Sequence, residues 1–135
     1  MLQLVCDTFP RSIVVLNVGN ILDMSWVEEC NPGAVLYAWQ GGQEGGLGVR
    51  DVLTGAVCPS GHLSDTIARQ MSDYPAAENY GDDLRNFYKE DIYVGYRYFE
   101  TFAPEKVLYP FGFGLSYTSF SRSLNFYDFT PKGLV

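Results

Sequence analysis

The chain has 135 residues, of which 47% are hydrophobic, 16% aromatic and 19% charged, and its formal net charge is −7. This length allows one domain at most, and the aromatic content excludes an intrinsically disordered chain. The longest apolar runs are far shorter than the ~20 residues of a membrane-spanning helix, and the negative charge argues against nucleic-acid partners.

The three cysteines are Cys6, Cys30 and Cys58. An odd number at wide, irregular spacing fits neither a disulfide framework nor a metal site. The N-terminal residues carry no basic segment of a signal peptide, and the sequence holds no glycosylation sequon. We therefore predict three reduced, mostly buried thiols in a cytoplasmic protein.

The first elements in chain order alternate between helix and strand. Residues 1–7 resemble the tail of a helix, and residues 12–18 form a β-branched run that predicts a strand buried on both faces, as in a parallel sheet. A short helix is expected to begin near Ser25, because Ser25 and Glu28 have the spacing of a capping box. Residues 31–33, Asn-Pro-Gly, are expected to end it.

A second strand and a second helix follow. Residues 34–39 predict the strand, residues 43–53 the helix, and Gly55 a left-handed residue at its C-terminus. This order is typical of an α/β layer with parallel strands. Two parallel strands make a poor sheet, so we expect the chain to be a fragment of a larger domain.

The remaining residues have a different character. We predict a turn at 59–61, a short extended segment at 62–67 and a long polar surface excursion at 72–91. Beyond residue 70 we find no helical periodicity. Residues 92–99 carry apolar or aromatic side chains at both odd and even positions, which predicts a segment covered on both sides. Residues 119–135 are expected to form a linker or the first strand of a following module.

Several candidate sites carry a weak signal. The glycine-rich residues 41–48 lack the end of a P-loop, and Glu44 would repel a phosphate. Ser60 does not lie in a nucleophile elbow, and we interpret His62 as a hydrogen-bonded turn residue. The paired carboxylates are adjacent in sequence and therefore point apart, so they do not flank a substrate bond; they are Glu28/Glu29, Asp82/Asp83 and Glu90/Asp91.

The aromatic segments 93–99 and 109–117 are the most unusual part of the composition. Aromatic platforms bind sugars and nucleobases, and the negative charge disfavours nucleobases. Packing in a core or between domains is the explanation that we favour for such segments at this stage.

Six blocks of residues in order give the chain a resemblance to the α/β-sandwich domain of glycoside hydrolase family 3, the β-glucosidases and their relatives. The resemblance covers about residues 11–120. The amino-acid sequence at residues 17–20 and 89–91 is most similar to that of enzymes from anaerobic gut bacteria. The blocks are residues 13–20, residues 42–46 with 51–53 and Gly55, residues 59–63, residues 73–75, residues 91–99 and residues 109–117.

The resemblance implies a fold and a domain organisation. The fold would be α/β, part of a three-layer α/β sandwich with a mostly parallel sheet, followed by an aromatic-rich irregular or β segment. Residues 1–120 would be part of that domain. Residues 121–135 would be a linker or the start of a fibronectin-type module.

The resemblance also implies a retaining β-glycosidase that acts on β-linked glucosides or oligosaccharides with two carboxylates about 5 Å apart. In the family the nucleophile is an Asp of the barrel domain, and the acid/base is a Glu ahead of the strand that matches residues 13–18. Neither matches a residue here, so we assign no catalytic residue, and we expect the chain alone to be inactive. No cofactor and no metal are implied.

For substrate binding we single out Trp39, Gln43 and Glu44, because they follow a strand where open α/β sheets bind ligands; turn formation explains them as well. The expected partners are the glucoside substrate, the barrel domain of the same enzyme and a second copy at the open sheet edge. The alternative is a non-catalytic sugar-binding or protein-docking module. A third alternative, a small flavodoxin-like binding protein, would need a phosphate-binding loop, which the sequence does not show.

Overall fold

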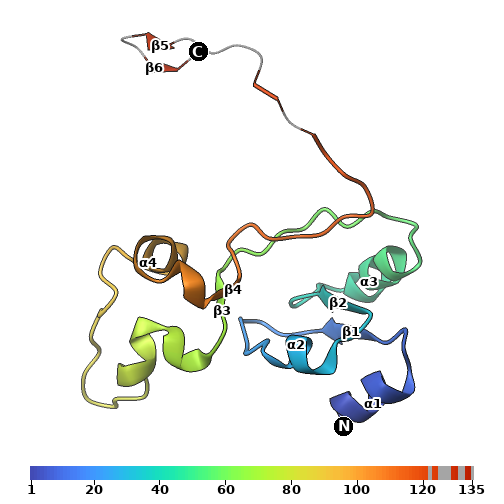
Figure 1. Ribbon diagram of the computed structural model, residues 1–135, viewed down its shortest axis with the longest axis horizontal. Helices are drawn as coiled ribbons and strands as arrows, with labels where there is room; N and C mark the ends of the chain where they lie inside the picture. The colour runs from blue at the N-terminus through green and yellow to red at the C-terminus, as the bar shows by residue number, and fades with distance from the viewer. Residues whose placement is uncertain (122, 125–128, 131–132, 135) are drawn as a thin grey trace.

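A computed structural model describes residues 1–121, 123–124, 129–130 and 133–134 (Figure 1). The N-terminal half contains α1 to α3 around the strands β1 and β2, and the second half contains α4 beside the strands β3 and β4. No helix in the described part of the chain is long and apolar enough to cross a membrane.

The N-terminal half has the predicted alternation. Its elements in order are α1 (Leu2–Thr8), β1 (Ile13–Leu16), α2 (Trp26–Cys30), β2 (Ala34–Tyr37) and α3 (Gly45–Leu53). β1 and β2 pair in parallel, with Ile13 opposite Ala34 and Leu16 opposite Tyr37. The prediction of an α/β layer with parallel strands is confirmed, and Gly55 after α3 has the expected positive φ of 75°.

The prediction that β1 is buried on both faces is wrong for this chain. Burial alternates along the strand, because Val14 and Leu16 are half-buried whereas Ile13 and Val15 are 52% and 40% exposed. Successive side chains of a strand point to opposite faces. One face of β1 therefore lies open, although its residues are apolar.

Helix α2 forms where expected, but not through a capping box. Ser25 is the N-cap residue, yet its backbone is in the helical region and its side chain makes no capping hydrogen bond. The amide of Ser25 instead donates to Oδ1 of Asp23 at 2.8 Å, and this bond lowers the pKa of the Asp23 carboxyl. The helix ends as predicted, at Asn31, which has a left-handed φ of 46°.

The second half is built around a small buried cluster. β3 (Ile67–Ala68) and β4 (Val107–Tyr109) pair antiparallel, and α4 (Tyr96–Phe102) packs beside them (Figure 1). Three short 3₁₀ helices, Met71–Asp73, Pro75–Asn79 and Pro104–Lys106, connect these elements. The cluster consists of Ala68, Phe99 and Ala103, with Tyr74, Tyr98 and Val107 packed against it.

Helix α4 corrects the prediction that no helix follows residue 70. Gly95, with a φ of 59°, precedes the helix, and Phe99 and Ala103 lie four residues apart on the buried side. The prediction that residues 92–99 are covered on both sides is also wrong, because Ile92 and Val94 are 63% and 56% exposed. The helix forms because one buried stripe of small and aromatic residues is enough to hold it against the core.

Tyr74 ties the core cluster to β3. Its hydroxyl donates to the carbonyl of Thr66 at 3.0 Å and accepts from the amide of Ala68 at 2.9 Å. Thr66 and Ala68 are both buried. A buried amide left without a partner costs free energy, so this single hydroxyl satisfies two backbone groups that water cannot reach.

Two segments that are distant in sequence run side by side between the halves (Figure 1). The amide of Leu63 donates to the carbonyl of Phe113, and the amide of Gly112 donates to the carbonyl of Leu63, both at 2.8 Å. The predicted extended segment 62–67 is thus paired at Leu63, and β3 begins at Ile67. Residues 59–61 form no turn in the described structure. The surface excursion 72–91 contains two 3₁₀ helices, followed by the exposed residues 80–89.

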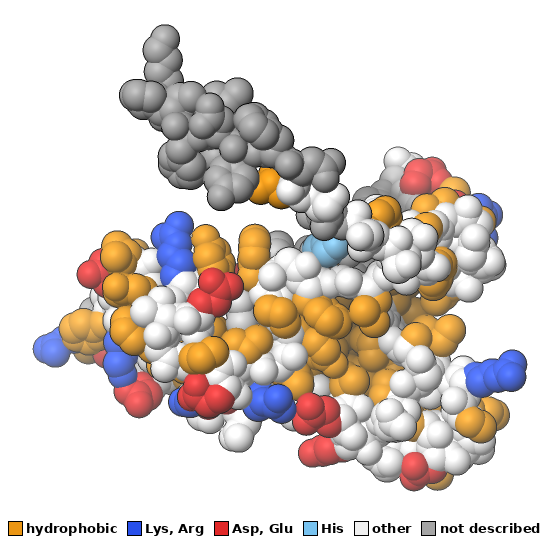
Figure 2. Space-filling model, turned by 45° about the horizontal axis from the view of Figure 1, so that its top comes forward, with side chains coloured by type: hydrophobic (Ala, Val, Ile, Leu, Met, Phe, Trp, Pro, Cys, Tyr) orange, Lys and Arg blue, Asp and Glu red, His pale blue; other side chains and the backbone are white. Residues whose placement is uncertain are grey.

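The chain leaves much of its surface open. Its accessible surface is 10789 Å², whereas a compact monomer of 15.1 kDa would expose roughly 7,100 Å². Figure 2 shows hydrophobic side chains spread over the face in view. Among the described residues, the buried hydrophobic ones are Met24, Ile67, Ala68, Phe99 and Ala103. Within residues 121–135, residues 122, 125–128, 131–132 and 135 lie outside the described residues. In this segment β5 (Phe129–Thr130) and β6 (Gly133–Leu134) pair antiparallel. The domain boundary after residue 120 stays a prediction.

All three cysteines are free thiols, as predicted, but the prediction that they are mostly buried is wrong, because Cys6 and Cys30 are half-buried and Cys58 is exposed. Its Sγ lies 3.0 Å from Oγ of Ser116. Hydrogen bonds from Ser116, and then from the amides of Tyr117 and Thr118, lower the pKa of the Cys58 thiol. Burial raises the pKa of the Cys30 thiol.

We therefore expect iodoacetamide near neutral pH to alkylate Cys58 first. A lower pKa gives a larger thiolate fraction at a given pH, and the thiolate is the nucleophile. Peptide mapping by mass spectrometry over time measures the order. Ser116→Ala should slow alkylation of Cys58 without affecting Cys30. Faster labelling of Cys30 than of Cys58 would contradict this account.

Candidate functional site

The carboxyl ends of β1 and β2 lie side by side, because the two strands are parallel and in register. The amide of Ala38 donates to the carbonyl of Leu16 at 2.9 Å, which extends the pairing to the end of β1. The loops after both strands therefore leave the sheet at the same edge. In open α/β sheets this edge is where ligands bind.

Side chains hold the two loops against each other. The hydroxyl of Tyr37 donates to the carbonyl of Asn20 at 2.6 Å. The side chain of Gln40 packs against Gly19 so closely that a Cβ there would lie 2.7 Å from its Nε2. Gly41 approaches the backbone of α3, since a Cβ at Gly41 would lie 2.8 Å from the Cα of Gly45. Larger residues would not fit this turn without a shift of the chain.

Trp39 has the most unusual conformation at this edge. Its φ is 53°, in the left-handed region that bulky residues rarely adopt. The indole is half-buried, and its centroid lies 4.6 Å from the ring of Tyr37 at an interplanar angle of 45°. Backbone conformations of this kind cost on the order of 1–3 kcal/mol and persist where surrounding contacts hold them, often at functional sites.

Gln43 and Glu44 are both exposed. Glu44 is the N-cap of α3 rather than a residue of its first turn, and its carbonyl accepts from the amides of Leu47 and Gly48 at 3.0 and 3.2 Å. Its side chain makes no capping hydrogen bond. The structure thus places Gln43 and Glu44 in the same loop as Trp39, with their side chains toward solvent. Their role in substrate binding stays a prediction.

Sequence reasoning missed Tyr37, Gln40 and Asn20 at this edge. Tyr37 closes an apolar run and therefore looked like a core residue of the strand. The tether from Tyr37 to Asn20 spans 17 positions, so no local pattern could have indicated it. The glycine at position 19 was the available signal, because a glycine in or near a strand often marks a place where another segment approaches closely.

The other candidate residues do not assemble a catalytic site. His62 is exposed and packs against Gly114, where a Cβ would lie 3.0 Å from its Cδ2. Among the described residues its ring makes no hydrogen bond, so the expected hydrogen-bonded turn histidine is wrong. No group of His, Cys, Asp and Glu in the described part of the chain could hold a metal ion.

Among the described residues, the two carboxyls whose pKa shifts, Asp23 and Glu78, both have it lowered. The amide of Ser25 lowers the pKa of Asp23, and the paired Lys89 lowers the pKa of Glu78. A general acid for glycoside hydrolysis needs a raised pKa. Neither residue is therefore suited to that role.

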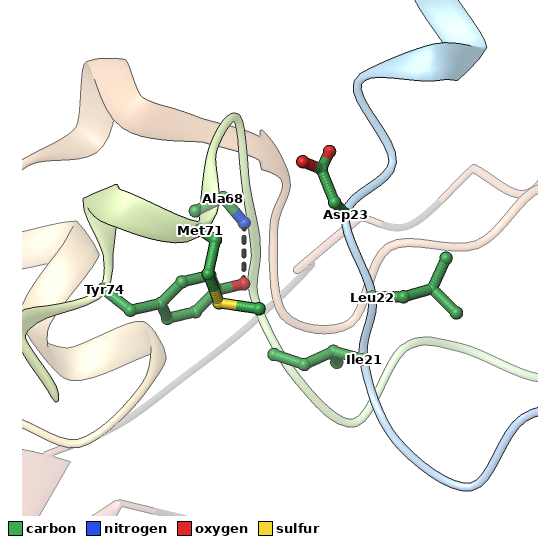
Figure 3. Close-up of a pocket in the computed structure, with 6 residues that line it drawn as sticks. All are labelled: Ile21, Leu22, Asp23, Ala68, Met71 and Tyr74. Atoms are coloured by element: carbon green, nitrogen blue, oxygen red, sulfur yellow. Dashed lines mark hydrogen bonds between the residues drawn. The ribbon is translucent and has the colours of Figure 1, made fainter. Parts of the chain in front are cut away.

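Two hollows in the described part of the chain are lined by residues other than Trp39, Gln43 and Glu44. One is lined by Ile21, Leu22 and Asp23 on one segment and by Ala68, Met71 and Tyr74 on another (Figure 3). Its volume of about 10 Å³ is close to that of a single water-sized sphere, so it cannot hold a sugar.

The second hollow, of about 440 Å³, lies in the surface excursion between Asn79, Phe87, Tyr88 and Lys89. Its rings are exposed, since Phe87 and Tyr88 are 55% and 88% accessible. Among the described residues, the side-chain amide oxygen of Asn79 has no hydrogen-bond partner, but it is fully shielded from solvent. A bound molecule could not reach this acceptor without a movement of the loop.

Comparison with known proteins identifies a family. The model of the glycosyl hydrolase family 3 C-terminal domain matches residues 1–117. The chain is 51% identical over 123 residues to a β-glucosidase of Ruminococcus albus, covering 91% of this chain and 13% of that protein. It is 53% identical over 124 residues to β-glucosidase A of Butyrivibrio fibrisolvens, covering 89% of this chain and 15% of that protein.

Solved structures give the same result. A β-glucosidase from Paenibacillus barengoltzii matches with a TM-score of 0.88 at 51% identity, over 94% of this chain and 14% of that one. The β-glucosidase of Kluyveromyces marxianus in complex with glucose matches with a TM-score of 0.86 at 38% identity, over 94% and 15%. The chain thus spans about one seventh of the length of these relatives.

Proposed function

The chain belongs to the glycosyl hydrolase family 3 C-terminal domain family, and from this membership we propose that it serves as that domain in a β-glucosidase. The supporting observation is the match of residues 1–117, together with 51% identity to a solved β-glucosidase at a TM-score of 0.88. The reaction would be hydrolysis of the bond between a β-linked glucose and its glycoside or oligosaccharide partner.

We propose that the two carboxylates of a retaining mechanism lie in other parts of the enzyme. One would attack the anomeric carbon, and the other would protonate the leaving oxygen about 5 Å away. The small share of the related β-glucosidases that this chain covers, 13% and 15% of their length, supports this division. The 135-residue chain alone would then be inactive.

The contribution of this chain would be a substrate-binding loop at the carboxyl ends of β1 and β2. The indole of Trp39 would stack on the apolar C–H face of a sugar ring, and Gln43 and Glu44 would accept hydrogen bonds from its hydroxyls. The shared sheet edge and the left-handed conformation of Trp39 support this proposal.

The uncovered surface supports a partner within the same enzyme. The open face of β1, with Ile13 and Val15, would pack in a complete three-layer sandwich, and the barrel domain would cover other apolar faces. A second copy at the open sheet edge is the competing occupant. Free thiols at all three cysteines are consistent with a cytoplasmic location.

The experiment is release of nitrophenol from nitrophenyl β-D-glucoside by the enzyme made from the complete reading frame that encodes this chain. We expect hydrolysis, and we expect Trp39→Ala to lower kcat/KM by about tenfold, equivalent to roughly 1.4 kcal/mol of transition-state binding. Trp26→Phe, in α2, is the matched control and should leave kcat/KM unchanged. Equal activity of both variants would remove Trp39 from the site, and absence of hydrolysis would favour a non-catalytic module.

A further inference from the structure

We infer that Tyr37 is a positioning residue for Trp39. By donating its hydroxyl to the carbonyl of Asn20 and packing its ring against the indole, it holds the indole in place at the carboxyl end of the β1–β2 sheet for a β-linked glucose ring. This inference deepens the proposed function and depends on it for the identity of the ligand.

The first step is the place of Tyr37 in the sheet. Tyr37 is the last residue of β2, opposite Leu16 at the end of β1. Its hydroxyl reaches across to the loop after β1 and donates to the carbonyl of Asn20 at 2.6 Å. The side chain is therefore fixed at both ends, by the strand at its Cα and by the neighbouring loop at its hydroxyl.

The second step is the contact with Trp39. The left-handed φ of 53° at Trp39 turns the chain sharply after β2, and the indole comes to lie 4.6 Å from the Tyr37 ring. A bulky residue relaxes from this conformation unless its surroundings hold it. The fixed ring of Tyr37 is the contact that can hold the indole, because ring pairs at such distances attract each other.

The third step is the protonation of the tether. Burial, and then the charge of Asp65, raise the pKa of the Tyr37 hydroxyl. The hydroxyl therefore keeps its proton at neutral pH and remains a donor to the carbonyl of Asn20. The tether should be insensitive to pH over the range in which glycosidases are assayed.

The fourth step is the ligand. The indole is half-buried, so part of it remains accessible at the sheet edge. A β-linked glucose ring carries its C–H bonds on the two faces of the ring, and these apolar faces suit a flat indole. Fixing the indole before binding reduces the conformational entropy that the complex loses.

The test uses the fluorescence of Trp39 in the 135-residue chain. Trp26 and Trp39 are the two tryptophans, so Trp26→Phe leaves Trp39 as a single reporter. In this background we compare Tyr37→Phe, which keeps the ring and removes the tether, with Tyr88→Phe, a matched control at an 88% exposed tyrosine. The readouts are acrylamide quenching of Trp39 and its response to methyl β-D-glucoside.

We expect Tyr37→Phe to increase quenching and to weaken the apparent affinity for methyl β-D-glucoside by about three- to tenfold, the range for one hydrogen bond, with circular dichroism unchanged. Tyr88→Phe should alter neither readout. Asn20→Gly keeps the acceptor carbonyl but frees its backbone, so it should also increase quenching. It serves as a second variant if Tyr37→Phe does not fold.

Unchanged quenching in Tyr37→Phe, or in Asn20→Gly where that variant replaces it, would overturn the inference. Increased quenching with no sugar response in any variant would support the positioning role of Tyr37 and contradict the proposed sugar site. The failure of the inference and the failure of the proposed function are thereby separated.

Discussion

Replacing Phe99 by alanine is expected to lower the free energy of unfolding by about 3–5 kcal/mol, the range for deleting a buried aromatic side chain. Phe99 is 1% exposed and belongs to the core cluster of the second half. Its ring meets Tyr74 edge-on at 5.4 Å and Tyr98 at 5.3 Å. The variant loses both ring contacts and leaves a cavity that the small neighbours Ala68 and Ala103 cannot fill.

Urea unfolding followed by circular dichroism measures this effect. The midpoint should fall sharply in Phe99→Ala, whereas Tyr88→Ala, at an 88% exposed ring, should stay within about 0.5 kcal/mol of the unsubstituted chain. A loss below about 1 kcal/mol in Phe99→Ala would mean that the cluster does not hold the second half together.

The second large effect is expected at Gly114. A Cβ there would lie 2.6 Å from the carbonyl oxygen of Gly61 and 3.0 Å from Cδ2 of His62. The first neighbour is backbone and cannot rotate away, so Gly114→Ala must separate the two paired segments. The hydrogen bonds of Leu63 with Gly112 and Phe113 would be lost. At about 0.5–1.5 kcal/mol each, these bonds alone account for roughly 1–3 kcal/mol.

The control is an alanine where the chain has room. Gly46 lies inside α3, and nothing lies within 4 Å of a Cβ built there. Gly46→Ala should stabilise the chain by up to about 1 kcal/mol through helix propensity. Opposite signs for the two variants, measured by urea midpoints and by amide exchange at Leu63, are the expected result. Equal midpoints would contradict the close contact at Gly114.

The sequence predicted the β1–α2–β2–α3 order because each element there carries its own local signal. The run at residues 12–18 is β-branched, and Asn-Pro-Gly at 31–33 ends a helix by backbone chemistry alone. The prediction of a capping box at Ser25 failed because its backbone has helical angles, whereas an N-cap residue that caps with its side chain has non-helical ones. Spacing alone cannot reveal that the amide of Ser25 binds Asp23 instead.

The second half was harder to predict for a physical reason. Its helix α4 carries aromatic residues on several sides, so its period is masked, and its position depends on Ala68 and Val107 from distant segments. The candidate site shows the same division. Trp39 could be found from its place after a strand, whereas its left-handed backbone and the tether from Tyr37 to Asn20 arise only when the two loops meet.

The most direct test of the account compares nitrophenyl β-D-glucoside hydrolysis by the 135-residue chain with hydrolysis by the product of the complete reading frame that encodes it. We predict no hydrolysis by the chain, and hydrolysis by the complete product with β-glucose as the first anomer released, as a retaining mechanism requires. Hydrolysis by the chain alone would contradict the assignment of the catalytic carboxylates to other parts of the enzyme. A complete product without this activity would contradict the proposed function itself.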